Sequence, residues 1–279
     1  MKISIITVNY NDHLGLERTL KSVQEQTTQD FEHIIIDGNS NDGSKELIER
    51  TKDNYSYMIS EPDHGVYDAM NKGIAQATGN YILFLNSGDT LYKNYIISKV
   101  QSYLDNTTAI VYGDLSIIGE DRPDFIHHYP RELDFNFFKR TSLGHPATFI
   151  KKELFDLYGN YRTDLPIASD WEFFLKTICI EKVSYKKMNV IVSNFYEGGI
   201  STTANNIENH KGEIKKVLLE HYDLYDSNFN ELLAAKQEND AVYASVNPHI
   251  KVVTTNAFFL KILNSIICLF AFVIKKKRS

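Results

Sequence analysis

Short runs of consecutive apolar residues recur through the first part of the chain, and polar turns separate them. The runs are Ile3 to Val8, Phe31 to Ile36, Ser56 to Ile59, Tyr81 to Leu85 and Ala109 to Asp114. Uninterrupted apolar runs of this kind are typical of strands buried on both faces of a sheet. Because segments with helical spacing alternate with these runs, we predict a mostly parallel α/β sheet with right-handed crossovers.

Two of the intervening segments place apolar residues at helical spacing. The first follows Asp12, a favourable helix cap, and its apolar positions are Leu16, Leu20 and Val23. The second runs from about Val66 to Ala77, and its polar face carries Asp68, Asn71 and Lys72. Because these three side chains point away from the core, they are able to converge on a ligand outside it.

The pattern changes after the fifth run. Residues 115 to 140 are irregular and aromatic, and a short strand at Ala147 to Ile150 and a short helix at Lys152 to Leu157 follow. Ser169 to Glu172 has the pattern of a capping box, which predicts a helix start. A Gly-rich turn is expected at Glu197 to Ser201, and a polar helical stretch from Ile207 to about Tyr243.

Composition narrows the class of protein. The chain has 279 residues, a net charge of −6 and two widely separated cysteines. An acidic balance argues against a general nucleic-acid surface, and isolated cysteines fit a reducing compartment. The N-terminal apolar run is too short for a signal peptide.

Small polar residues follow the fourth strand directly, as Asn86-Ser87-Gly88-Asp89. In a parallel α/β sheet, ligands bind just beyond the carboxyl ends of the strands. A carboxylate at that place is suited to Mg²⁺ or Mn²⁺, which prefer hard oxygen ligands. A strand followed by a simple polar turn is the alternative.

Five motifs in order resemble a family 2 glycosyltransferase of the bacterial polysaccharide-assembly type. They are Ser4 to Asn11, the strand-end Asp37, Asp63 to Gly73, Leu85 to Asp89 and Ala168 to Trp171. The resemblance implies a GT-A fold, with a mostly parallel central sheet flanked by helices and a helical C-terminal extension. It also implies inverting transfer of a sugar from a nucleotide diphosphate, with a UDP-sugar favoured, to a hydroxyl.

The resemblance assigns roles to individual residues. Asp89 matches the last acid of the family's Asp-x-Asp motif and becomes the metal ligand for Mn²⁺ or Mg²⁺. The first position of that motif departs from the family, because Ser87 and Asn86 offer only neutral oxygens. Asp170 matches the general base. His145 matches a position near the acceptor or the metal.

The remaining matched residues are donor-binding candidates. Asp37 would hydrogen-bond the nucleotide base, and the other candidates are Thr7, Asn9, Tyr10, Asp68, Asn71, Lys72, Asn86 and Ser87. Structural alternatives stay open for several of them. Asp37 also suits a turn, Asp68 and Lys72 suit an i, i+4 helix pair, and Asp170 suits a helix N-terminus for the dipole alone.

The C-terminal part lies outside the resemblance. We expect a catalytic domain at 1–204, divided into a nucleotide-binding half at 1–114 and an acceptor half at 115–204. A helical extension at 205–254 and an amphipathic helix at 255–279 would follow. Ala257 to Ile274 is nearly all apolar and precedes the basic run Lys275 to Arg278.

This tail predicts where the protein acts. Basic residues that flank a membrane segment stay in the cytoplasm, and the catalytic domain must lie there too, because nucleotide sugars are cytoplasmic. Both ends of the segment would then lie on the same side of the membrane, so we do not expect a single span. We predict a helix lying on the inner face of the cell membrane, which suits a glycan acceptor carried on a polyprenyl diphosphate. A buried helix or a dimer contact is the alternative.

The sequence bears on three other functions. A nicotinamide-dependent oxidoreductase lacks support because no G-x-G-x-x-G follows the first strand. A nucleotidylyltransferase would need a Gly-rich, basic triphosphate loop at the same place. A catalytically inactive nucleotide-sugar or carbohydrate binding module remains an alternative, because the Asp-x-Asp motif is reduced.

Overall fold

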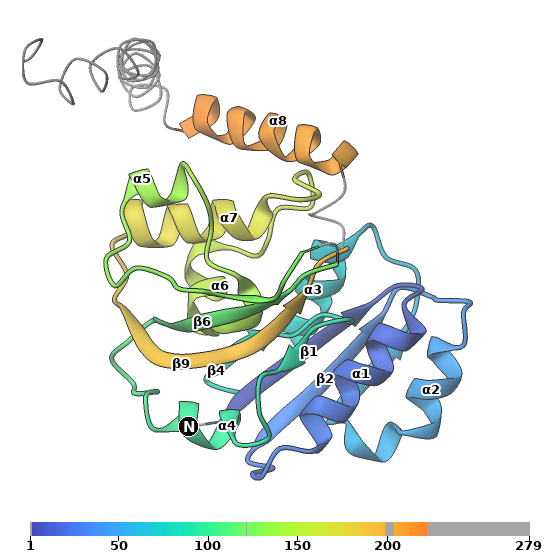
Figure 1. The fold of residues 1–279 in the computed structure, drawn as a ribbon. Coiled ribbons are helices and arrows are strands. Elements are labelled where there is room, and N and C mark those ends of the chain that lie inside the picture. The colour runs from blue at the N-terminus through green and yellow to red at the C-terminus, as the bar shows by residue number, and fades with distance from the viewer. Residues whose placement is uncertain (1, 121, 199–203, 222–279) are drawn as a thin grey trace, which may run out of the picture. The chain divides into compact units, whose positions relative to one another are not determined.

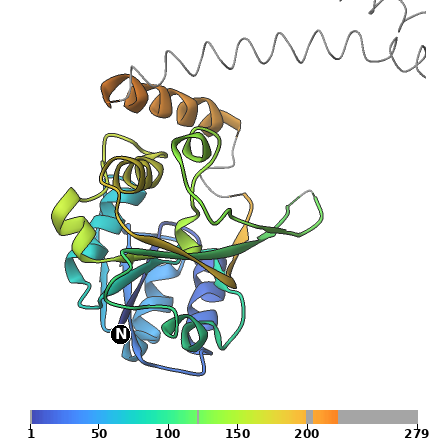
Figure 2. The same cartoon turned by 90° about the vertical axis from the view of Figure 1, so that its left-hand side faces the viewer.

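The computed structural model describes residues 2–120, 122–198 and 204–221. The chain divides into two compact units, Met1–Lys215 and Lys216–Ser279. In the first unit, helices cover both faces of a curled central sheet (Figure 1, and from the side Figure 2). This arrangement agrees with the predicted α/β class.

Nine strands in the described part of the chain form the sheet, in the order β3-β2-β1-β4-β8-β6-β9-β5, with β7 paired to β6. Their bounds are β1 Ile3–Asn9, β2 Phe31–Asp37, β3 Tyr57–Ser60, β4 Tyr81–Phe84, β5 Thr90–Leu91, β6 Ile110–Ile118, β7 Phe125–His127, β8 Thr148–Lys151 and β9 Tyr185–Tyr196. The strands β3, β2, β1 and β4 are parallel, as predicted. β8 is antiparallel to both β4 and β6, while β6 and β9 run parallel.

The helices are mostly short. They are α1 His13–Gln24, α2 Ser44–Arg50, α3 Val66–Gln76, α4 Ile96–Gln101, α5 Phe135–Phe138, α6 Glu153–Tyr158, α7 Ser169–Phe174 and α8 Ala204–His221, with a π-helical turn at Leu175–Ile180 after α7 and 3₁₀ turns at Lys52–Asn54 and His145–Ala147. Helix α1 begins as predicted, because the Asp12 carboxylate accepts the Gly15 N–H at 3.0 Å.

Apolar packing holds the helices on the sheet. Leu16 and Leu20 of α1 form a buried cluster with Ile35 of β2 and with Leu47 and Ile48 of α2. Helix α3 packs against β1 so closely that a Cβ at Gly73 would lie 2.5 Å from an Ile6 methyl carbon. This approach needs glycine, and it fixes the polar face of α3 relative to the strand ends.

Two sequence predictions about local structure are wrong. Residues 115 to 140 are not simply irregular, because β6 continues to Ile118 and pairs with β7. Ser169 to Glu172 is not a capping box, since the N-cap residue of α7 is Ala168 and the N-cap makes no side-chain hydrogen bond. The Ser169 hydroxyl is buried and has no hydrogen-bond partner among the described residues.

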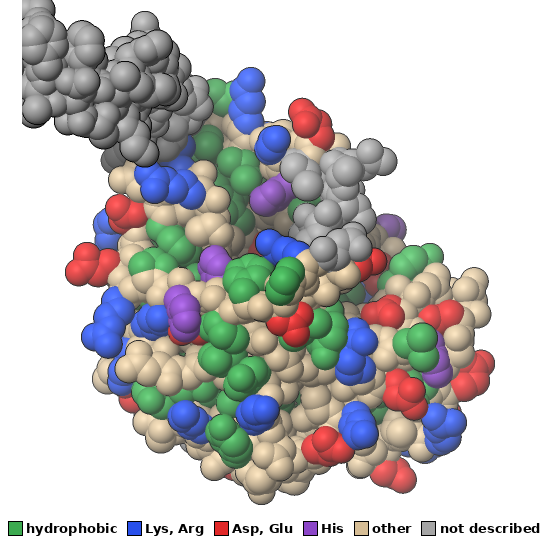
Figure 3. All heavy atoms as spheres, viewed as in Figure 1, with side chains coloured by type: hydrophobic (Ala, Val, Ile, Leu, Met, Phe, Trp, Pro, Cys, Tyr) green, Lys and Arg blue, Asp and Glu red, His purple; other side chains and the backbone are tan. Residues whose placement is uncertain are grey.

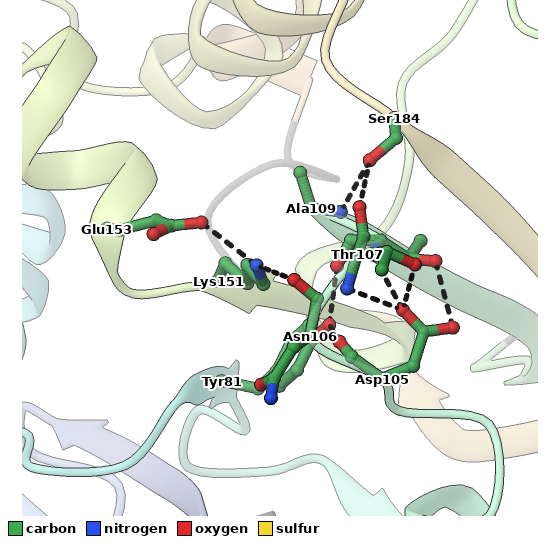
Figure 4. A network of polar contacts seen from close by, with 9 residues as sticks. Tyr81, Asp105, Asn106, Thr107, Ala109, Lys151, Glu153 and Ser184 are labelled. Atoms are coloured by element: carbon green, nitrogen blue, oxygen red, sulfur yellow. Dashed lines mark hydrogen bonds and ion pairs between the residues drawn. The ribbon is translucent and has the colours of Figure 1, made fainter.

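A polar network ties together the strand starts at the opposite edge of the sheet (Figure 4). The Asp105 carboxylate accepts the N–H groups of Thr107 at 2.8 Å and Thr108 at 2.7 Å. Lys151 at the end of β8 donates to the Asn106 carbonyl at 2.5 Å and pairs with Glu153 at 3.0 Å. Through the Tyr81 hydroxyl, which donates to the Asp105 carbonyl at 2.5 Å, the network also joins the start of β4 to the segment before β6.

Charged side chains of both signs are interspersed over the face drawn in Figure 3. No single-sign field dominates that face.

Candidate functional site

The carboxyl ends of β1, β2 and β4 meet at one edge of the sheet. Asn9 ends β1 opposite Asp37, which ends β2, and Asn86 to Asp89 follow β4. The predicted site residues from these three strands are therefore brought to one edge. Their contacts differ from residue to residue.

Asp37 is completely buried and fully hydrogen-bonded by the protein. Its Oδ1 accepts from Asn9 Nδ2 at 2.7 Å and from the Ser40 hydroxyl at 2.6 Å. Its Oδ2 accepts from the Ser40 N–H at 3.0 Å and from the Ser60 hydroxyl at 2.5 Å. In this structure Asp37 organises the loop after β2, and its oxygens are already occupied. Asn9 Oδ1, in contrast, is buried without a partner among the described residues.

Thr7 and Tyr10 lie in very different surroundings. The Thr7 side chain is buried and lies 3.0 Å from His33 Nε2, inside the layer between the sheet and α1. Tyr10 is 66% exposed at the end of β1. A Cβ at Gly38 would lie 3.1 Å from the Tyr10 ring and 2.5 Å from the Asp63 carboxylate. Tyr10 and Asp63 therefore border the same exposed corner.

The three polar residues of α3 are engaged with the protein. Asp68 Oδ2 accepts the His64 N–H at 3.0 Å and lies 3.7 Å from Lys72 Nζ. Lys72 pairs more closely with Glu61, at 2.8 Å. Asn71 donates to the Tyr161 carbonyl at 2.9 Å and accepts its N–H at 3.1 Å. Asn71 therefore binds the loop before α7 to α3 through both of its amide atoms.

Asp89 is a buried carboxylate, 5% exposed, near the sheet edge. Burial raises its pKa to about 7, although the charges of His145 and Arg18 and a hydrogen bond from the Tyr196 N–H act in the opposite direction. That hydrogen bond is 3.3 Å long. Burial disfavours the ionised form of this carboxylate, and a nearby cation would stabilise that form.

The donor set around Asp89 fits a divalent cation. Asn86 Oδ1 is buried and has no hydrogen-bond partner among the described residues, so it is a free neutral oxygen in the same turn. No group of three or more His, Cys, Asp or Glu side chains arranged for a metal occurs in the described part of the chain. The Ser87 N–H donates to the Val8 carbonyl at 3.0 Å. With no such group among the described residues, a cation held by Asp89 would need a bound diphosphate to supply further ligands.

Asp170 lies near the start of α7, and its side chain is 16% exposed. Its Oδ2 lies 3.3 Å from His145 Nδ1, and its Oδ1 lies 2.7 Å from the Tyr67 hydroxyl. Burial alone would raise the pKa of Asp170, but the hydrogen bonds from His145, Tyr67 and the Trp171 N–H hold it below its ordinary value. The carboxylate is therefore ionised at neutral pH.

His145 connects the segment after β4 to α7. Its Nε2 lies 3.2 Å from Asn86 Nδ2, which is a donor, so Nε2 accepts and Nδ1 carries the hydrogen toward Asp170. When the ring is protonated, its charge also lowers the pKa of Asp89. The two acids that the sequence places 81 positions apart thus share His145 as a neighbour.

Several residues of this site were missed from the sequence. Tyr67 lies within the matched stretch Asp63 to Gly73, but its place on the buried face of α3 indicates only packing. Arg18 donates to the Gly88 carbonyl at 3.0 Å and lies 4.0 Å over the Tyr196 ring, yet nothing in the sequence pairs these positions. The Gly-rich turn predicted at Glu197 to Ser201 lies, beyond Gly198, outside the described residues.

The sequence matches a family model described as Glycosyl transferase family 2 over residues 4–155. A PGL/p-HBAD biosynthesis glycosyltransferase of Mycobacterium bovis is 31% identical over 206 residues, which cover 72% of this chain and 79% of the relative. A putative teichuronic acid biosynthesis glycosyltransferase, TuaG of Bacillus subtilis, is 27% identical over 157 residues, covering 54% of this chain and 62% of that protein.

Solved structures share the fold at low sequence identity. S. aureus TarS residues 1–349 with UDP-GlcNAc superimpose with a TM-score of 0.63 at 16% identity, covering 79% of this chain and 66% of that one. A mannosyltransferase from Pyrobaculum calidifontis with GDP-Man and Mn²⁺ gives 0.57 at 16% identity, covering 98% and 86%. This likeness confirms the predicted GT-A fold.

The predicted membrane-associating helix at 255–279 lies outside the described residues. Within the part that the structure describes, no helix has the length and apolar character needed to cross a bilayer.

Proposed function

Because the chain belongs to the Glycosyl transferase family 2, we propose that it moves a sugar from a nucleotide diphosphate donor to a glycan hydroxyl, with inversion at the anomeric carbon. The M. bovis and B. subtilis relatives are named for PGL/p-HBAD and teichuronic acid biosynthesis. These names support a role in the synthesis of a surface polysaccharide or glycolipid. A UDP-sugar is the favoured donor, since TarS binds UDP-GlcNAc on the same fold.

The observation that supports this proposal most strongly is the position of His145. Its Nδ1 hydrogen-bonds Asp170, and its Nε2 accepts from Asn86, which lies in the same turn as Asp89. The candidate base and the candidate metal ligand are thus neighbours of one imidazole. Inverting transfer needs this proximity, because the acceptor must attack from the side opposite the departing diphosphate.

Asp170 is proposed as the general base. An ionised carboxylate with a free lone pair is able to take the proton of the acceptor hydroxyl as its oxygen attacks. His145 and Tyr67 hold the carboxylate from two sides and fix its orientation. A pKa below the ordinary value keeps the base ready at neutral pH.

Asp89 and Asn86 Oδ1 are the groups that would hold a divalent cation. Such a cation supplies positive charge that neutralises the departing diphosphate. Mn²⁺ accompanies GDP-Man in the P. calidifontis mannosyltransferase, which supports Mn²⁺ or Mg²⁺ here. Ser87 would contribute only a neutral oxygen.

The exposed corner at the end of β1 is proposed to receive the nucleoside. Tyr10 presents an exposed ring for stacking on a base, and the unpaired Asn9 Oδ1 lies in the same strand end. Asp37 acts on this corner by shaping the loop after β2, because its own oxygens are occupied. Asp68 and Lys72 contact the segment that contains Asp63, through the His64 N–H and the Pro62 carbonyl, and Lys72 would face the donor after leaving Glu61.

The C-terminal tail extends the proposal to the acceptor. An amphipathic helix at 255–279 with its basic end would hold the enzyme on the inner membrane surface. An acceptor on a polyprenyl diphosphate would then lie in the same plane as the enzyme.

A donor-hydrolysis screen tests the proposal. Purified full-length protein is incubated with UDP-GlcNAc, UDP-glucose, UDP-galactose or GDP-mannose, with and without Mn²⁺, and release of the nucleotide diphosphate is measured. We expect turnover of at least one donor, and its loss in Asp170→Asn with nucleotide binding retained. Binding without turnover of any donor would favour an inactive binding module instead.

A further inference from the structure

Helix α8 contacts the chain directly before the candidate base. The Glu213 Oε2 atom accepts the Ile167 N–H at 3.0 Å and the Ala168 N–H at 2.8 Å. Glu213 is half-buried and lies in the same compact unit as α7. A charged acceptor shared by two adjacent peptide N–H groups makes stronger bonds than a neutral one.

These two peptides set the start of α7. Ala168 is the cap residue of that helix, and Asp170 is its second residue. The helix has no side-chain cap of its own, because the Ser169 hydroxyl has no partner among the described residues. The Glu213 carboxylate, 45 positions further along the chain, therefore accepts the N–H of the N-cap residue Ala168, as a local capping side chain otherwise would.

The other side of the same peptide segment faces the base. The Tyr67 hydroxyl oxygen lies 2.8 Å from the Ile167 carbonyl and 2.7 Å from Asp170 Oδ1. Its single proton serves one acceptor at a time. Ile167 thus binds Glu213 through its N–H and borders the Tyr67–Asp170 contact through its carbonyl.

We propose that Glu213 is a positioning residue for Asp170, acting through the backbone of Ile167 and Ala168. The inference rests on the proposed role of Asp170 as general base. Glu213 does not touch the reacting atoms. It holds the residues that decide where the carboxylate of Asp170 points.

The proposal has a consequence for the extent of the catalytic domain. The family model matches residues 4–155, so Glu213 lies outside it. The boundary that the sequence suggested, at residue 204, would also exclude it. If Glu213 positions the base, the catalytic domain includes α8 at least to that residue.

Four full-length variants test this: Glu213→Ala, Glu213→Gln, Glu208→Ala and Asp170→Asn. The probe is the nucleotide sugar that the wild type hydrolyses fastest among UDP-GlcNAc, UDP-glucose and GDP-mannose, since water attacking in place of the acceptor also needs the base. Steady-state kinetics give kcat and KM separately, and circular dichroism gives Tm. Glu208 is an exposed acid of the same helix and serves as the matched control.

We expect Glu213→Ala to lower kcat about tenfold or more with KM within about twofold of wild type, because misplaced catalytic groups lose rate steeply. Glu213→Gln should recover most of kcat, since its amide oxygen accepts the same two N–H groups. Glu208→Ala should match wild type. A folded Glu213→Ala with unchanged kcat, or a Gln variant as impaired as the Ala variant, overturns the inference.

Two further results keep the outcome unambiguous. If Glu213→Ala is unfolded at the assay temperature, Glu213→Asp replaces it, because its shorter side chain retains the charge and withdraws the carboxylate. Unchanged kcat in that variant overturns the inference. Wild-type turnover by Asp170→Asn refutes the proposed base itself, whereas an inactive Asp170→Asn beside a fully active Glu213→Ala refutes only the role of Glu213.

Discussion

The Nδ1 atom of His145 lies 3.3 Å from Oδ2 of Asp170, and the imidazole is only 18% exposed. On its other side the same ring accepts from the Asn86 amide. His145 is thus placed between the turn after β4 and the start of α7. This contact explains why an almost buried aspartate stays ionised.

Replacing His145 by Ala should raise the pKa of Asp170. Burial raises this pKa, and the replacement removes the His145 hydrogen bond and charge that lower it. A base with a raised pKa is protonated at a higher pH. We therefore expect the acidic limb of the kcat/KM profile to move to higher pH and turnover at pH 6 to fall more than at pH 8. A profile that keeps its wild-type limb would contradict the assignment.

Removing the Tyr67 hydroxyl should act on the same carboxylate. Tyr67→Phe keeps the ring but removes a donor to Asp170 Oδ1, so kcat should fall while the donor KM stays near wild type. Tyr161→Phe is the matched control. The centroid of the Tyr161 ring lies 5.4 Å from that of Tyr67. The Tyr161 hydroxyl is buried and has no hydrogen-bond partner among the described residues. Equal losses in the two variants would show that the effect is only packing.

The stability of the metal-free protein should depend on pH through Asp89. Its pKa is about 7 in the fold and about 3.9 in an unfolded chain, so the folded state binds the proton more tightly. The unfolded chain is ionised from about pH 4 upward, and stability therefore falls as pH rises from about 4 to 7. Asp89→Asn removes this loss because asparagine does not titrate.

Urea denaturation at pH 5 and pH 8 measures this difference. The free energy of unfolding of Asp89→Asn, relative to wild type, should rise by about 2–3 kcal/mol between the two pH values. Added Mn²⁺ should stabilise the wild type at pH 8 and leave Asp89→Asn nearly unaffected. A wild type and a variant with parallel pH dependence would be inconsistent with the buried carboxylate.

The space beside Gly38 provides a test of the nucleoside corner. A Cβ there would lie 2.5 Å from the Asp63 carboxylate, so Gly38→Ala must displace Asp63 or the Tyr10 ring. We expect a several-fold rise in donor KM and Kd for UDP, with kcat changed less, as measured by calorimetry and kinetics. Gly212→Ala in α8 is the control, because nothing lies within 4 Å of its added carbon. Unchanged UDP affinity in Gly38→Ala would place the nucleoside elsewhere.

The strands and the candidate metal turn could be predicted because local pattern determines them. Continuous apolar runs such as Tyr81 to Leu85 have few other solutions, and a polar turn after such a run must lie at a sheet edge. The family motifs then assigned Asp89 and Asp170. The predicted capping box at Ser169 failed because α7 begins one residue earlier, so that the Glu172 N–H already donates to the Ala168 carbonyl, at 2.9 Å.

The sequence by itself determined the α/β class and the parallel half of the sheet, since these depend on periodicity, and its motifs predicted Asp89 and Asp170 as site residues. The tertiary structure alone decided which side chains surround those acids. His145 and Tyr67 contact Asp170 from 25 and 103 positions away, and Glu213 binds the Ala168 N–H from 45 positions away. The oxygens of Asp37 are occupied by its own neighbours. Hydrogen bonds and burial depend on distance in space, and that distance exists only after the chain has folded.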